Sequence, residues 1–194
     1  MMNQITETAI EIIQDLLCGE KPLIVSIDGR CASGKTTLAM ALQSYFHCNV
    51  IHMDHFFLRP EQRTQERIDT PGENVDHERF LGEVLLPLRK GEDFFYRPFH
   101  CGSQTFADPI LVRNNPLTIV EGSYSCYEKL RDYYDLRIFM SVDSKEQMRR
   151  ILLRNGQNQA AVFQNKWIPL EEAYFSAFDV EWRADHCFCT SENL

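Results

Sequence analysis

A glycine-rich octapeptide near the N-terminus constrains the fold of this chain more than any other feature. Residues 29–36 read Gly-Arg-Cys-Ala-Ser-Gly-Lys-Thr, which matches the P-loop pattern G-x-x-x-x-G-K-S/T. In a P-loop the glycines let several backbone N–H groups point at one polyphosphate. The lysine reaches the β- and γ-phosphates, and the threonine hydroxyl ligates Mg²⁺. Such a loop follows a buried strand and opens a helix, so the neighbouring segments test the assignment.

Both neighbouring segments have the required character. Residues 23–27 are a short apolar run rich in β-branched side chains, which is typical of a strand buried on both faces. Residues 37–42 are strong helix formers. The alternative, a glycine turn that binds nothing, gives no reason for Lys-Thr to follow Gly34. We therefore expect the loop to bind ATP through Gly29, Ala32, Ser33, Gly34, Lys35, Thr36 and Thr37.

The overall composition narrows the class of partner. A chain of 194 residues is long enough for one domain with an insertion, and its net charge of −8 argues against a general nucleic-acid binder. No apolar run approaches the length of a membrane span, and the first residues lack the apolar core of a signal peptide. Seven cysteines, an odd number, suit a reducing compartment. We expect a cytoplasmic protein with a small-molecule substrate and no nucleic-acid or membrane partner, and the sequence leaves open a homo-oligomer.

Helical and strand patterns alternate along most of the chain. Apolar spacing predicts helices over residues 3–18, 35–46, 144–154 and 169–180, and strands over 22–28, 49–53, 116–122, 136–141 and 185–190. Strands that alternate with helices indicate a mostly parallel sheet with helices on both faces, the three-layer α/β fold of P-loop NTPases. Ligands bind at the carboxyl ends of the strands in such folds.

Residues 55–116 interrupt this alternation. They hold six of the eight prolines, with a helix predicted over 76–90 and a hairpin of short strands at 94–96 and 104–112. Binding residues often lie on loops that a rigid scaffold carries. We therefore interpret this segment as a substrate-binding insertion within a single domain over residues 1–194.

Two acidic residues stand where predicted strands end. Glu121 follows an apolar run, and with Thr36 it is our candidate ligand for Mg²⁺. Asp54 follows another run and precedes Phe57, which could form the wall of a pocket. A carboxylate at position 54 could accept the proton of an attacking hydroxyl, and it could also touch Mg²⁺. The alternative is that both are ordinary acids of turns or strand ends.

Three arginines lie on the helix predicted after residue 143. Arg150 and Arg154 are one turn apart, and Arg149 is adjacent. Because arginine stabilises charge on a transferring phosphoryl group, Arg154 is a candidate catalytic residue and Arg150 a candidate ATP ligand. The alternative is a helix face that is simply solvated.

Four segments together resemble one known family. They are residues 27–37 (Ile-Asp-Gly-Arg-Cys-Ala-Ser-Gly-Lys-Thr-Thr), 53–57 (Met-Asp-His-Phe-Phe), 74–80 (Asn-Val-Asp-His-Glu-Arg-Phe) and 119–122 (Ile-Val-Glu-Gly). Their order and spacing are similar to those of the uridine kinase branch of the uridine kinase/phosphoribulokinase family. The second and third segments distinguish this family, because the P-loop alone would not identify it.

The resemblance implies roles for individual residues. Asp54 matches the general base of the family, and Lys35 and Arg154 are our other two candidate catalytic residues. Asp76 matches an acid that contacts the ribose hydroxyls, and residues 96–100 fall where the family lines its nucleoside pocket. Residues 150–168, approximately, match a mobile lid over ATP. The substrate-binding residues implied in this way are Asp54, Phe57, Asp76, Arg79, Tyr96 and His100.

These observations predict an ATP- and Mg²⁺-dependent kinase that phosphorylates a small molecule, with the 5′-hydroxyl of uridine or cytidine as the leading acceptor. The chain departs from the family after His100, where the expected histidine is missing, and its lid segment is short. A second hypothesis is therefore a kinase of the same fold acting on another alcohol, such as a sugar, a pantothenate-like acid or a vitamin precursor. A third is a nucleotide-binding regulatory module without chemistry, although the Asn-Lys-x-Asp motif of GTPase switches is not found.

Overall fold

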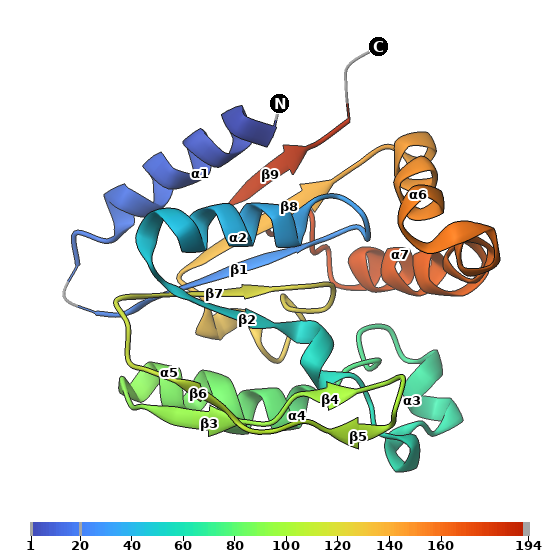
Figure 1. Ribbon diagram of the computed structural model, residues 1–194, viewed down its shortest axis with the longest axis horizontal. Coiled ribbons are helices and arrows are strands. Elements are labelled where there is room, and N and C mark those ends of the chain that lie inside the picture. The colour runs from blue at the N-terminus through green and yellow to red at the C-terminus, as the bar shows by residue number, and fades with distance from the viewer. Residues whose placement is uncertain (1, 20, 192–194) are drawn as a thin grey trace.

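A parallel sheet of five strands forms the centre of the molecule, in the order β2-β7-β1-β8-β9 (Figure 1). The computed structural model describes residues 2–19 and 21–191, so the ends of the domain predicted over residues 1–194 lie outside the described residues. The strands are β1 Leu23–Gly29, β2 Asn49–His52, β7 Leu117–Glu121, β8 Leu136–Ser141 and β9 His186–Cys189. All five strands predicted for the sheet are confirmed.

Helices α1 (Met2–Leu16) and α2 (Lys35–Phe46) cover one face of the sheet (Figure 1). Alternate residues of β1 pack on opposite faces of the sheet, as expected of a strand that is covered on both sides. Val25 and Ile27 belong to the core formed with α1 and α2, whereas Ile24 belongs to the core on the opposite face. The strand-loop-helix unit predicted from the P-loop is therefore present.

The opposite face packs against a second helical layer. α4 (His77–Phe80), the π-helical turn η3 (Leu81–Leu85) and α5 (Leu86–Lys90) follow one another without a break, in agreement with the helix predicted over 76–90. Their apolar residues share a core with the fully buried Tyr174 of α7 (Ile168–Ala177). The loop before β8, which ends in the short helix η4 (Arg131–Tyr133), completes this layer with Tyr127 and Leu130.

The segment from residue 53 to residue 112 lies beneath the sheet in Figure 1. It contains η1 (Met53–Phe56), η2 (Pro60–Gln62), α3 (Gln65–Asp69) and two antiparallel strand pairs, which are β3 (Phe94–Tyr96) with β6 (Ile110–Val112) and β4 (Phe99–His100) with β5 (Thr105–Phe106). The single strand predicted over 104–112 is wrong, because the chain leaves the ladder at residues 107–109. Pro109 lacks the N–H that a continuous ladder needs.

Helix α6 (Ser144–Val162) begins where it was predicted but continues past residue 154. Asp143 caps it by accepting hydrogen bonds from the backbone N–H groups of Lys145 and Glu146. Gly156 has non-helical backbone angles (φ 76°, ψ 171°) and divides α6 into two stretches. The π-helical η5 (Phe163–Trp167) then leads into α7. Within the described residues, no helix is both long enough and apolar enough to cross a bilayer.

Candidate active site

The P-loop adopts a curled conformation between β1 and α2. Gly29, Ala32 and Gly34 all have positive φ, at 133°, 59° and 98°. Only glycine fits at position 29, since a Cβ there would lie 2.0 Å from the carbonyl oxygen of Met140 on β8. These positive-φ residues, spaced along the loop, help to turn backbone N–H groups toward one concave side, where an anion can bind.

Two side chains of the motif make contacts at the carboxyl ends of the strands. Lys35 donates hydrogen bonds from Nζ to the carbonyl oxygens of Gly29 (2.6 Å) and Arg30 (2.9 Å). Thr36 donates from its hydroxyl to Oε2 of Glu121 at 3.1 Å. Because β1 and β7 are paired with Ile27 opposite Glu121, the sheet register itself brings this carboxylate to the loop.

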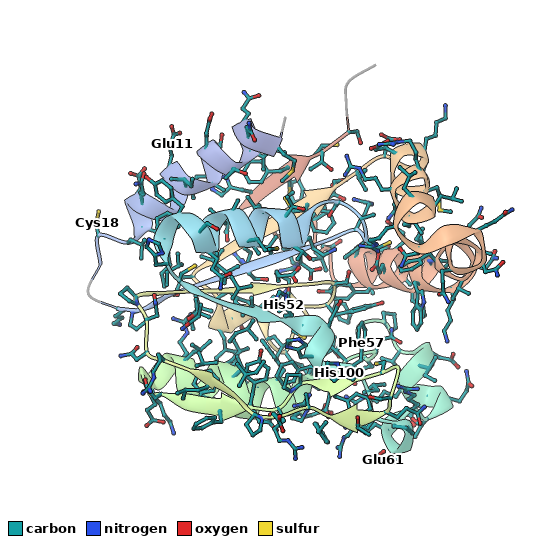
Figure 2. All side chains as sticks on the ribbon, in the orientation of Figure 1. Glu11, Cys18, His52, Phe57, Glu61 and His100 are labelled. Atoms are coloured by element: carbon teal, nitrogen blue, oxygen red, sulfur yellow. The ribbon has the colours of Figure 1, made fainter. Side chains whose placement is uncertain are left out.

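Glu121 is nearly buried and has a second partner. Its Oε1 lies 2.5 Å from Nδ1 of His52, the last residue of β2. This hydrogen bond holds the pKa of His52 above its usual value, although partial burial of the imidazole acts in the opposite direction. In Figure 2, His52 and Phe57 mark the path of the chain from the end of β2 into the layer beneath the sheet.

Asp54 stands at the same edge of the sheet, in η1. Its carboxylate makes no hydrogen bond to the described residues, and its exposed surface faces the cavity that it lines. Desolvation by the surrounding walls and the charge of Glu121 raise the pKa of Asp54, and the charge of Lys35 opposes them only in part. A carboxylate with a raised pKa is a better proton acceptor near neutral pH.

The outer side of the P-loop is held by three groups from two helices, α6 and α7. Glu171 of α7 accepts the backbone N–H of Cys31 at 2.9 Å, and Gln147 of α6 donates to the Cys31 carbonyl at 3.0 Å. Arg150 of α6 donates to the carbonyl of Ala32 at 3.0 Å. The conformation of the loop therefore depends on contacts far from it in the sequence.

A cavity of about 870 Å³ adjoins the P-loop, and we call it the P-loop cavity. It collects residues from α2, η1, the end of β7, α6, η5 and α7. Ten of the site residues predicted from the sequence line it, namely Ala32, Gly34, Lys35, Thr36, Thr37, Asp54, Phe57, Glu121, Arg150 and Arg154.

The other predicted site residues do not line this cavity. Gly29 and Ser33 form the base of the loop, where Gly29 offers its carbonyl to Lys35. Asp76 caps α4 and accepts from Gln62 at 2.9 Å. The remaining three also lie elsewhere: Tyr96 pairs through its hydroxyl with His55, Arg79 donates to the carbonyl of His55, and His100 is an exposed residue of β4.

Three further residues of the site are not among the site residues predicted from the sequence. His52 is hydrogen-bonded to Glu121, and Glu171 accepts the backbone N–H of Cys31 in the P-loop. Asp28 is fully buried below the loop, where it accepts hydrogen bonds from the backbone N–H of Gly29 (2.6 Å) and Cys126 (2.9 Å). Burial raises the pKa of Asp28 to about 6. The place of Asp28 directly before the P-loop motif is the one feature of the sequence that indicates a role for this residue.

The donor set of the cavity fits a metal-bound polyphosphate. Lys35, Arg154 and Lys166 line it, and none of these cations forms an ion pair with a carboxylate of the described residues. The curled loop adds backbone donors for phosphate oxygens. Thr36 and Glu121, with Asp54 nearby, offer the oxygen ligands that Mg²⁺ prefers. The residues present therefore fit both ATP and Mg²⁺.

Known kinases resemble this chain both in sequence and in fold. No protein-family model matches the chain. A uridine kinase of Geobacillus kaustophilus (strain HTA426) is 25% identical over 156 residues, which cover 75% of this chain and 72% of that protein. A solved structure described as a possible uridine kinase from Bacillus stearothermophilus has a TM-score of 0.70 at 18% identity and covers 96% of both chains. D-glycerate 3-kinase from Cryptococcus neoformans has a TM-score of 0.65 at 14% identity, covering 96% of this chain and 95% of its own.

These likenesses confirm the α/β fold predicted from the P-loop and the alternating elements. They support a P-loop kinase of small-molecule substrates. The names of these similar proteins refer to different acceptors, uridine and D-glycerate. The chain thus has the fold of the P-loop kinases and resembles the uridine kinases in its sequence.

Proposed function

We propose that this protein is an ATP- and Mg²⁺-dependent kinase that transfers a phosphoryl group to a hydroxyl of a small molecule. The observation that carries the proposal is the convergence of the P-loop, the Thr36–Glu121 pair and Asp54 on one cavity. These groups supply the three requirements of phosphoryl transfer, which are a phosphate cradle, metal ligands and a residue that positions the attacking oxygen.

Asp54 would act as the general base of this reaction. Its raised pKa favours acceptance of the hydroxyl proton as the acceptor oxygen forms its bond to the γ-phosphorus of ATP. The bond from that phosphorus to the bridging oxygen breaks, and ADP leaves with the electron pair. Lys35 and Arg154 would offset the charge of the transferring group. Bound Mg²⁺, held by Thr36, Glu121 and Asp54, would neutralise phosphate charge.

The two sides of the P-loop cavity would then serve the two substrates. Residues 150–168 carry Arg154 and Lys166, and we assign this segment as the lid over ATP. Residues 55–116 contribute Phe57 and Arg63, and we assign this segment to the acceptor. The elements that supply the cavity wall support both assignments.

Uridine and cytidine, phosphorylated on the 5′-hydroxyl, are the first acceptors to test, since curated relatives are named uridine kinases. A specific observation favours a second candidate, which is another small alcohol. Asp76, Tyr96 and His100, to which the resemblance assigns nucleoside contacts, lie outside the P-loop cavity. Asp76 and Tyr96 are also engaged by Gln62 and His55.

The test is release of ADP from Mg·ATP with a panel of nucleosides, sugars and vitamin precursors. Asp54→Asn should lower turnover by about 10²-fold or more while ATP binding is retained, because the amide cannot accept the proton. Asp132→Asn is the matched control, since Asp132 is 85% exposed and pairs only with Arg131 among the described residues. Near-normal turnover of Asp54→Asn would show that the base is misassigned. Tight ATP binding without stimulation by any acceptor would favour a regulatory module.

A further inference from the structure

Arg63 differs from the neighbouring arginines of the acceptor-side segment. Arg59 is ion-paired with Glu61, Arg67 with Glu73 and Glu78, and Arg79 with Glu83. Arg97 donates to the carbonyl of Ala107 and does not line the P-loop cavity. Among the described residues, no carboxylate pairs with Arg63, and this side chain lines the P-loop cavity. The segment therefore presents one cation to the cavity without an internal counter-charge.

The guanidinium of Arg63 is anchored from one side. Its Nε donates to the carbonyl oxygen of Leu58 at 3.0 Å, and one terminal nitrogen lies 4.0 Å from the Cys101 sulfur. A thiol is a weak acceptor, so the terminal donors remain available for a stronger one. Arg63 is an exposed residue, and Leu58 and Ile68 line the same cavity.

Arg63 and Asp54 line the same cavity, and so does Cys101. Burial raises the pKa of Cys101, while the charge of Arg63 lowers it and the charge of Asp54 raises it. Both charges therefore lie within electrostatic range of a single sulfur. By contrast, Arg154 and Lys166 come from α6 and η5, which Figure 1 shows at the right of the molecule above the layer that contains α3.

We propose that the acceptor carries an anionic group, a carboxylate or a phosphate, which Arg63 binds while Asp54 faces the hydroxyl to be phosphorylated. The inference rests on the proposed kinase function and names its substrate class. Arginine suits this task because its planar fork matches the oxygens of both anions. A neutral nucleoside would leave the guanidinium without a partner of equal strength.

The test compares alcohols that differ in one anionic group. ADP release from Mg·ATP is measured with pantothenate and pantothenyl alcohol, glycerate and glycerol, ribose 5-phosphate and ribose, and uridine. Arg63→Gln removes the charge, and Arg63→Lys keeps the charge but loses the fork. Arg113→Gln is the matched control, since it removes one charge from the same segment at a residue that is 72% exposed and paired with Asp93.

We expect an acid to be used in preference to its neutral counterpart. Arg63→Gln should raise the KM for that acid by roughly 10- to 100-fold with a smaller effect on kcat, as expected for loss of a charged hydrogen bond. Arg63→Lys should recover part of the loss, and Arg113→Gln should behave as wild type. If the preferred acceptor is a carboxylic acid, the group that Arg63 binds is a carboxylate. If the preferred acceptor is ribose 5-phosphate, that group is a phosphate.

Failure of the inference and failure of the kinase function give different results. Equal use of acids and neutral counterparts, or a preference that survives Arg63→Gln, would overturn the anionic acceptor and leave the kinase standing. If no acceptor stimulates ADP release by the wild type, the kinase function fails. The anion site is then tested separately, by measuring whether the same acids raise the melting temperature of the protein without nucleotide. A shift that Arg63→Gln abolishes supports the anion site, and a shift that is absent or independent of Arg63 refutes it.

Discussion

The hydroxyl of Tyr174 allows a quantitative test of how the carboxylate beneath the P-loop is held. Tyr174 donates a hydrogen bond to Oδ2 of Asp28 at 2.8 Å, and both side chains are fully buried. The same oxygen accepts the backbone N–H of Cys126. Tyr174→Phe removes one donor and leaves the ring in place, so its effect reports the hydrogen bond rather than a cavity.

The magnitude of this effect depends on the charge of Asp28. A hydrogen bond to a charged group contributes about 1.5–3 kcal/mol, and one to a neutral group about 0.5–1.5 kcal/mol. Burial raises the pKa of Asp28 to about 6, so the carboxylate is charged above that pH and neutral below it. Tyr174→Phe should therefore destabilise the protein more above the Asp28 pKa than below it.

The sign of the pH dependence follows from proton linkage. Because the folded pKa of Asp28 lies above the unfolded value, the folded state binds more protons between the two, and stability falls as pH rises through that window. The Tyr174 hydrogen bond lowers the pKa of Asp28. Its loss moves the upper limit of the window to higher pH and deepens the fall.

Urea unfolding followed by circular dichroism, on both sides of the Asp28 pKa, measures the difference. Tyr134→Phe is the control, since Tyr134 is also buried but its hydroxyl has no hydrogen-bond partner among the described residues. We expect this control to be neutral or stabilising at both pH values, because it removes an unsatisfied polar group. An equal loss for Tyr174→Phe at both pH values, or an equal loss for the two variants, would refute the reasoning.

Three further predictions concern the loop and the acids at the strand ends. Turnover should fall as pH is lowered through the raised pKa of Asp54, since the protonated acid cannot accept a proton, and a pH profile of kcat/KM that stays flat across that pKa would contradict this. Gly29→Ala should destabilise the fold by more than about 3 kcal/mol in urea titrations, because its Cβ would meet the carbonyl of Met140, whereas Gly102→Ala, with no atom within 4 Å of its Cβ, should change stability by less than about 0.5 kcal/mol. Glu121→Gln should raise the Mg²⁺ concentration needed for half-maximal turnover, as a titration after removal of metal by chelation would measure, and an unchanged requirement would exclude this carboxylate as a ligand.

The sequence predicts the sheet and the P-loop well because both depend on local patterns. A buried parallel strand requires a continuous apolar run, and the curled loop requires glycine where a Cβ would strike β8. Glu121 and Asp54 could be named as site candidates because strand ends of one parallel sheet meet at one edge. Both line the P-loop cavity.

The residues that the sequence does not predict reach the site through tertiary contacts. Glu171 lies far from Cys31 along the chain and binds its N–H only because α7 packs under the loop. Asp28 and Tyr174 are likewise joined across the core. The acceptor side is harder still, since the short helices of residues 53–69 have weak local patterns and Arg63 stands out only once its neighbours are seen to be paired.

The interruption of α6 at Gly156 gives its two stretches different attachments. The first is tied to the P-loop by Gln147 and Arg150, while the second carries only Ala160 among its buried residues. Backbone amides before the glycine should therefore exchange with deuterium slowly and those after it quickly. If nucleotide orders the second stretch, the departure of ADP requires those turns to loosen again, and this local opening becomes a step of each turnover.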